Sequence, residues 1–73
     1  MVYELRSPVE GVVIRADVDE GQMVAEEDEI GVLDTEGGRV VIRTDVPGVV
    51  RELYLDAGRF VARGGVVALI DEA

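Results

Sequence analysis

Apolar and polar residues alternate along most of the chain, in short runs separated by turn-forming residues. The runs cover residues 3–6, 12–18, 22–24, 30–34, 39–44, 49–55, 59–61 and 65–71. A period of two is typical of strands that bury one face, and the many valines favour strands. The acidic segment 25–29 is too short for a stable helix and is expected to be a loop or a single turn. The pattern therefore predicts an all-β protein of eight short strands, a small sandwich or barrel.

The second half of the chain repeats the first at an offset of 37 residues. Laying residues 9–36 over 46–73 gives nine identities, among them Gly11 with Gly48 and Asp34 with Asp71. Two copies of a four-strand unit are expected to pack about a pseudo-twofold axis, because each buries the apolar face that the other cannot cover alone. We therefore expect one domain, residues 1–73, built from two quasi-symmetric halves.

The predicted core follows from the alternation and from the agreement between the two copies. It consists of aliphatic residues at matching strand positions: Val13, Val18, Val24, Ile30, Leu33, Ile42, Val50, Leu53, Leu55, Val61, Val67 and Ile70.

The two copies meet at a turn formed by residues 34–39, DTEGGR. Apolar runs precede and follow it, at 30–33 and 40–42, which predicts a β-hairpin. Glycine is favoured at such a tip because it reaches positive φ without a Cβ clash, and this requirement accounts for the pair Gly37-Gly38.

Charge is distributed unevenly between the two copies. The chain has 16 acidic residues, seven arginines and no lysine, a net charge of −9. Residues 1–37 hold eleven of the acids and two arginines, whereas residues 38–73 hold five of each. Nucleic acid and anionic membranes are therefore poor partners. Solubility or adaptation to high salt explains the excess, and a docking surface for a basic partner is the alternative.

The side-chain inventory excludes several kinds of chemistry. The absence of His and Cys removes the usual zinc ligands and the usual general base. Ser7 is the only serine and has no histidine to activate it. The acidic stretch 26–29 lacks the spaced ligands and central glycine of a calcium loop, and it offers no pocket that would shift a carboxyl pKa. We therefore predict no catalytic residues and no metal site, and the protein is not expected to be an enzyme.

Several segments resemble biotinyl and lipoyl attachment domains. Residues 7–13, SPVEGVV, and 18–24, VDEGQMV, resemble the opening of these domains, and 30–36, IGVLDTE, resembles the strand that enters their modified hairpin. Residues 46–50, VPGVV, and 55–64, LDAGRFVARG, resemble the closing half. The likeness covers residues 4–71 without a gap. It implies a flattened eight-stranded barrel-sandwich hybrid of two quasi-symmetric four-strand halves.

The chain departs from this family at the residue that carries the cofactor. In the family, a lysine at the hairpin tip bears biotin or lipoate, and the register on both sides places Gly37 there. Asp34, Thr35 and Glu36 follow the lipoyl pattern, whereas Ser7-Pro8 leans toward the biotinyl one. The resemblance thus implies a degenerate attachment turn at Glu36, Gly37 and Gly38 with no bound cofactor expected. Arginine cannot replace the lysine, because it stays protonated.

The sequence leaves three functions open. In the first, the domain is a carrier-like module without a cofactor that acts as a non-catalytic subunit or a regulatory or docking module of a carboxylase or acyl-transfer complex. Alternatively it is a genuine biotin or lipoyl carrier whose lysine was replaced by engineering, or a structural interaction module of the same fold. A protein partner is expected in each case. No apolar run approaches the length of a membrane span, so a cytoplasmic protein is expected, with its oligomeric state open.

Overall fold

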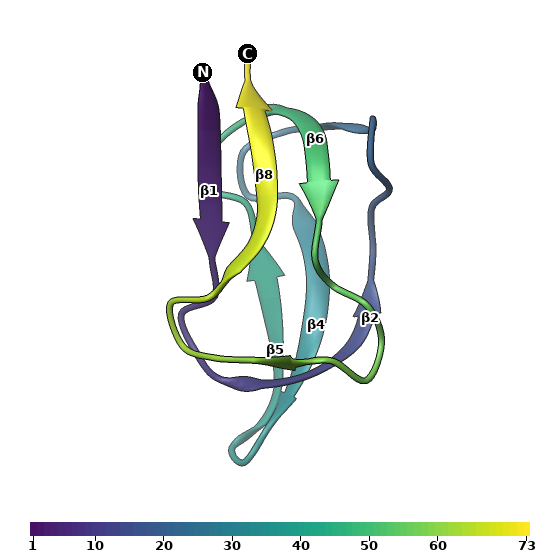
Figure 1. Cartoon of the computed structure of the whole chain (residues 1–73), viewed down its shortest axis with the longest axis vertical. Helices are drawn as coiled ribbons and strands as arrows, with labels where there is room; N and C mark the ends of the chain where they lie inside the picture. The colour runs from purple at the N-terminus through teal and green to yellow at the C-terminus, as the bar shows by residue number, and fades with distance from the viewer.

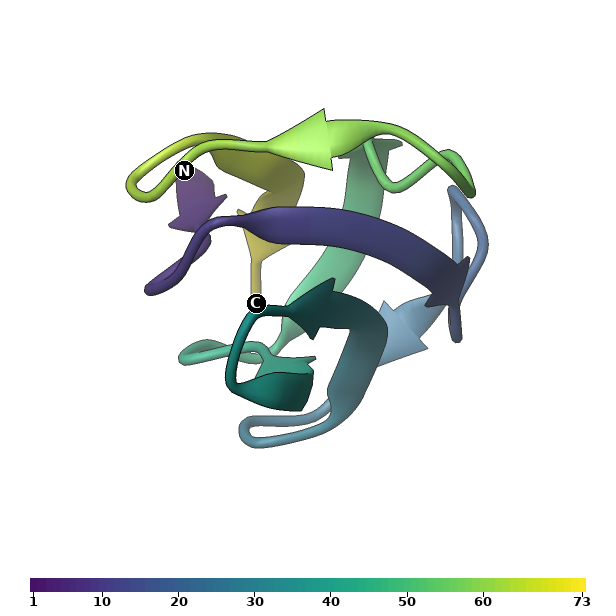
Figure 2. The ribbon, with the colours of Figure 1, turned by 90° about the horizontal axis from the view of Figure 1, so that it is seen from below.

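A computed structural model describes all residues, 1–73, and contains eight β-strands. The strands form two four-stranded antiparallel sheets, in the orders β1-β8-β6-β3 and β5-β4-β2-β7, which lie face to face (Figures 1 and 2). The bounds are β1 (Val2–Arg6), β2 (Gly11–Ala16), β3 (Met23–Val24), β4 (Glu29–Thr35), β5 (Gly38–Arg43), β6 (Gly48–Leu53), β7 (Phe60–Val61) and β8 (Val66–Glu72). This confirms the predicted all-β, flattened barrel-sandwich fold. None of its elements is a helix long and apolar enough to cross a membrane.

The two halves are related by the sequence offset itself. Adding 37 to the bounds of β2, β3 and β4 gives those of β6, β7 and β8, and β5 ends at the shifted end of β1 but begins one residue earlier, at Gly38. The same shift converts the strand order of one sheet into that of the other, so each sheet takes two strands from each half. Backbone hydrogen bonds between the halves also come in pairs related by 37 residues: Gly21 N–H donates to the Val50 carbonyl, and Gly58 N–H donates to the Val13 carbonyl. The halves are therefore interlocked rather than stacked.

Thirteen buried side chains form one core between the sheets. Eleven of the twelve predicted core residues belong to it, whereas Leu53 is half-buried and packs against it. The pattern also missed Leu5 and Ala68, which are fully buried. Leu5 is the counterpart of Ile42 at the 37-residue offset, so the repeat itself carried the signal for its burial.

Two buried hydroxyls fix the turns that follow the edge strands β1 and β5. Ser7 Oγ donates to the Val9 carbonyl and accepts from its N–H, and Thr44 Oγ1 does the same with Val46. Ser7 and Thr44 are equivalent at the 37-residue offset, and both are almost inaccessible to solvent. A buried hydroxyl must be hydrogen-bonded to avoid a desolvation penalty, and here the turn backbone satisfies it.

The molecule is elongated, with extents of 34 × 18 × 16 Å. The β4–β5 hairpin projects from one end of the long axis, and both chain termini lie at the other end (Figure 1). The fold therefore presents the predicted attachment turn as an isolated tip.

Candidate functional site

The candidate site is the tip of the β4–β5 hairpin. The ladder closes with Thr35 opposite Gly38, which leaves Glu36 and Gly37 as a two-residue turn. Residues 36–39 are all exposed. The structure thus brings together the three residues of the predicted turn, Glu36, Gly37 and Gly38, at the outermost point of the molecule (Figure 1).

A threonine hydroxyl holds the turn closed. Thr35 Oγ1 donates to the Gly38 carbonyl at 2.6 Å and accepts from the Gly37 N–H at 3.1 Å. Side-chain hydrogen bonds of this kind offer the backbone a local partner and are typical of turns. The tip therefore has a defined backbone in which the side chain at position 37 would stand in solvent.

Only one of the two tip glycines needs its conformational freedom. Gly38 has a φ of +111°, which side chains rarely adopt, whereas Gly37 is not among the residues with positive φ. A Cβ built at Gly37 meets nothing closer than Thr35 Oγ1, at 3.8 Å. The expectation that the turn requires both glycines is therefore wrong for Gly37, where the fold has room for a side chain.

The hairpin is supported where β2 crosses the end of β4. A Cβ added to Gly11 would lie 2.6 Å from the Asp34 carbonyl oxygen and 3.0 Å from Thr35 Cγ2. A glycine here lets the backbones approach more closely than a side chain would allow. The start of β2 therefore packs closely against the base of the hairpin.

A groove of about 560 Å³ runs beside the tip. Phe60 on β7 and Val12 on β2 are its exposed apolar residues, and the half-buried Val9 adds to them. The remaining lining comes from the hairpin and from the loops around β2 and β7: Val9, Glu10, Gly11, Asp34, Thr35, Glu36, Gly37 and Arg63. The sequence pattern did not single out this groove, because Phe60 reaches it from the other half of the repeat.

The shifted carboxyl groups lie away from the tip. Asp17 and Glu29 are hydrogen-bonded to each other, which lowers the pKa of Asp17 and raises that of Glu29. Arg15 contributes to the lowered Asp17 pKa through a 2.8 Å contact from Nε to Asp17 Oδ1, and it lies 3.7 Å from Glu29 Oε2. Hydrogen bonds to carboxylates also raise the pKa of two tyrosines, that of Tyr3 on β1 (to Asp45) and that of Tyr54 directly after β6 (to Glu52).

The remaining predicted residues do not assemble into a second site. No group of three or more acidic side chains is arranged to hold a metal ion. In the acidic stretch, Asp28 Oδ2 accepts a hydrogen bond from the Ala25 N–H at 2.8 Å, so this carboxylate stabilises the loop in which it lies. Ser7 is buried in its turn, as described above. The hairpin and its groove are thus the only place where the predicted residues gather at an exposed surface.

Three comparisons with known proteins bear on this geometry. The family model described as "Biotin-requiring enzyme" matches residues 3–70. The crystal structure of the Kluyveromyces lactis urea carboxylase aligns with a TM-score of 0.89 and 21% sequence identity, over 96% of this chain and 6% of that one. At 21% identity this alignment shows similarity of fold only. The search of curated proteins found no match by sequence. The family match spans both halves of the repeat and the hairpin between them, and the chain therefore belongs to the biotin/lipoyl domain family.

Proposed function

We propose that this domain is a family member that carries no cofactor and acts as a non-catalytic subunit, or a regulatory or docking module, of a carboxylase or acyl-transfer complex. The observation that supports this most directly is the hairpin tip. The turn is complete, closed by Thr35 and exposed, yet glycine stands where the family has its lysine. Such a domain retains the shape of a carrier without its reactive amine.

The residues at the tip do not fit a covalently attached cofactor. Biotin and lipoate are joined to a side-chain amine through an amide bond, and the sequence has no lysine. Arg39 is the nearest cation along the hairpin, but a guanidinium stays protonated and is not a nucleophile at neutral pH. We therefore assign no group-transfer step to this chain.

One observation favours a second candidate, a genuine carrier whose lysine was replaced by engineering. The backbone at Gly37 accepts a side chain without strain and points it into solvent. A lysine restored there would thus occupy a competent position.

Intact-mass spectrometry after co-expression with a biotin ligase and a lipoate ligase tests the unmodified state. The chain as it stands should gain no mass with either enzyme. Gly37→Lys should fold and accept lipoate more readily than biotin, because Asp34, Thr35 and Glu36 resemble the lipoyl flank. Gly38→Lys is the matched control: its φ of +111° opposes a side chain, and it should be destabilised by about 1 kcal/mol and remain unmodified. Modification of the unmutated chain would contradict the proposal.

Affinity capture from the source cell tests the docking role. A carboxylase or acyl-transfer subunit should be retained, and a lysine-bearing carrier domain in excess should displace it, because both present the same hairpin end. Capture of a transport component alone would favour the structural module instead.

A further inference from the structure

An exposed cross-strand row lies at the hairpin end of one sheet. Phe60 on β7 pairs with Val12 on β2, Val12 pairs with Asp34 on β4, and Asp34 pairs with Arg39 on β5. The side chains of Phe60 and Val12 are 59% and 42% exposed. The row thus presents an adjacent aromatic and aliphatic pair followed by a carboxylate and a guanidinium.

The repeat supplies a counterpart of this row at the opposite end of the molecule. Met23, Val49, Asp71 and Val2 are neighbours across the other sheet in the same order, and a second groove, of about 430 Å³, lies beside them. The backbone plan is shared, so differences in side chains distinguish the two grooves. At the hairpin end Phe60 replaces Met23, Glu10 replaces Pro47 and Arg63 replaces Glu26.

The charged side chains that line the hairpin groove form no salt bridge within the molecule. Glu10, Asp34, Glu36 and Arg63 line it, and none of them forms an ion pair within 4.0 Å. In the counterpart groove, by contrast, the Asp71 carboxylate lies 3.7 Å from the Met1 ammonium group. The hairpin groove therefore has a surplus of unpaired negative charge beside its apolar pair.

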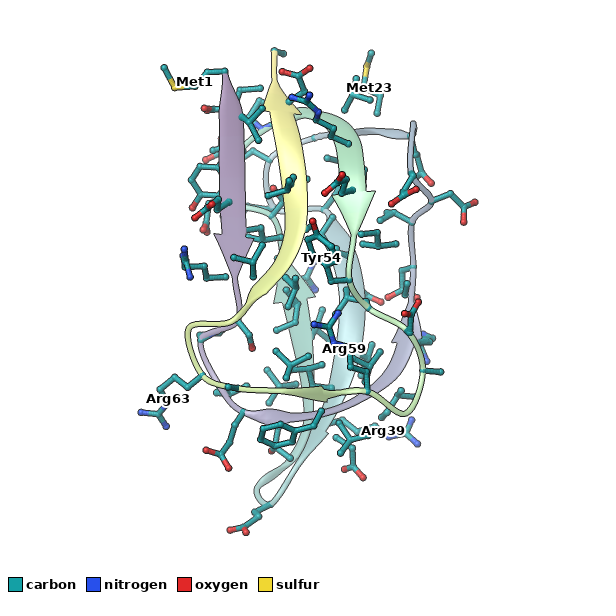
Figure 3. The ribbon with its side chains drawn as sticks, in the orientation of Figure 1. Met1, Met23, Arg39, Tyr54, Arg59 and Arg63 are labelled. Atoms are coloured by element: carbon teal, nitrogen blue, oxygen red, sulfur yellow. The ribbon has the colours of Figure 1, made fainter.

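Two arginines lie near the hairpin end of the molecule. Figure 3 shows Arg39 and Arg63 on opposite sides of the lower end of the molecule, with both side chains directed outward. A ligand with positive charge at its centre is attracted to the carboxylates, whereas positive charge at its margins is repelled by the guanidinium groups.

We propose that this groove binds an extended segment of a partner protein in which an apolar residue and a single Lys or Arg are two positions apart. This inference rests on the proposed docking function and names the chemistry of the partner's side. Residues two apart in an extended chain are separated by about 6.4–6.8 Å, and neighbouring strands by about 5 Å. The apolar side chain then covers Phe60 and Val12 while the basic group reaches Asp34, between one and two strand spacings away.

Chemical-shift titration of the ¹⁵N-labelled protein with short blocked peptides tests the pairing. The probes are Ac-Ser-Phe-Ser-Lys-Ser-NH₂, the same peptide with Glu in place of Lys, and the same peptide with Ala in place of Phe. Only the first should shift the amides of Val12, Asp34 and Phe60 in the millimolar range, and added salt should weaken it. Equal binding of the Glu peptide, shifts confined to the Met23–Val49 end, or no binding by any peptide would overturn the proposal.

Matched variants separate recognition from folding. Phe60→Ala and Asp34→Asn should each weaken the Lys peptide at least about fivefold, while Met23→Ala, the counterpart of Phe60→Ala, should leave its affinity unchanged. Arg63→Glu introduces the residue found at the counterpart position and should strengthen binding. Circular dichroism establishes that each variant is folded, as expected for exposed positions. If a carboxylase or acyl-transfer subunit is captured equally by wild type, Phe60→Ala and Asp34→Asn, this inference is wrong while the proposed function stands.

Discussion

Glu27 adopts a backbone conformation that is unfavourable for its side chain. Its φ of 72° makes it the only non-glycine residue in the left-handed region, and its counterpart in the repeat, Gly64, has a φ of 79°. The two N–H groups donate to equivalent carbonyls, those of Thr44 and Ser7. The fold therefore requires a positive φ at this turn position in both halves, and glutamate adopts it although its Cβ makes this conformation unfavourable.

Glu27→Gly should stabilise the protein by up to about 1 kcal/mol, because glycine enters the left-handed region without a Cβ penalty. Glu26→Gly is the control, since residue 26 has no positive φ and gains nothing from the change. Urea unfolding of the three proteins measures the difference. Equal stabilisation by both variants would assign the gain to the loss of negative charge instead.

The Asp17–Glu29 pair makes a prediction about pH. The hydrogen bond to Asp17 raises the pKa of Glu29, and the positive charges of Arg15 and Arg43 only partly oppose the shift. A raised folded-state pKa contributes stability below the unfolded pKa and loses it as pH rises through the folded value. Glu29→Gln keeps a neutral donor toward Asp17 at every pH. The Tm of Glu29→Gln should therefore exceed that of wild type, and the difference should grow between about pH 4 and pH 7 because Glu29 ionises in wild type over this range. A margin that shrinks over this range would show that the arginines dominate.

At the scale of single residues, the sequence predicted where the hairpin turn lies but not its backbone conformation. The family register placed Gly37 at the lysine position, and the structure puts that residue at the tip. Two adjacent glycines are compatible with several turns, so the sequence does not tell which of them takes positive φ, and the structure shows that it is Gly38. The pairing of Phe60 with Val12 depends on a sheet contact between the two halves, which local patterns do not encode.

The β4–β5 hairpin is the element on which the proposed function depends, and its two glycines allow a direct comparison. Gly38→Ala should cost about 1 kcal/mol, because alanine opposes the φ of +111°. Gly37→Ala should be neutral or slightly stabilising, since its Cβ has room and the unfolded chain loses freedom. Denaturant unfolding of both variants provides the measurement. Equal costs would mean that Gly37 also needs its freedom, and would weaken the case for restoring a lysine there.

Among the strands, prediction was most accurate where alternation and repeat agreed. All eight predicted runs overlap observed strands. The loop or turn expected over residues 25–29 is found at 25–28, but the expectation is wrong for Glu29, which is the first residue of β4. The runs 12–18 and 49–55 extend past the strand ends at Ala16 and Leu53. Beyond these ends, the backbone still makes isolated hydrogen bonds, from Asp17 N–H to Ile30 and from Tyr54 N–H to Val67. Alternating apolar residues therefore continue into the bends that lead out of each strand.

For the molecule as a whole, the pseudo-twofold axis predicts that equivalent substitutions have equal effects. Val13 and Val50 are 2% and 0% exposed and occupy matching places in β2 and β6. A carboxylate at either place is buried without a partner and should cost several kcal/mol, most or all of the stability of a domain this small. Circular dichroism of Val13→Asp and Val50→Asp should show lost structure in both. A wild-type melt for either variant would contradict the equivalence.

The uneven charge predicts a response to salt. Most acids of the first half, including Asp19, Glu20, Glu26 and Glu27, form no ion pair. Screening their mutual repulsion should raise Tm between about 0.02 M and 1 M NaCl. The double variant Glu26→Gln with Glu27→Gln should gain less, since it has less repulsion to screen. A flat or falling trend in wild type would favour a surface adapted to a specific partner.

The position of the chain ends has a consequence for how this domain is combined with others. By the 37-residue offset, Met1 is the counterpart of Gly38 and Ala73 that of Glu36, and the Glu72 N–H donates to the Met1 carbonyl at 2.9 Å. The ends thus meet where a second hairpin tip would be, with one position, the counterpart of Gly37, left between them. A single inserted residue should close the backbone into a ring, and the ring should tolerate being reopened elsewhere. Because the two ends lie side by side, the domain should also fold when it is inserted into a surface loop of another protein, with the β4–β5 hairpin directed away from the point of insertion.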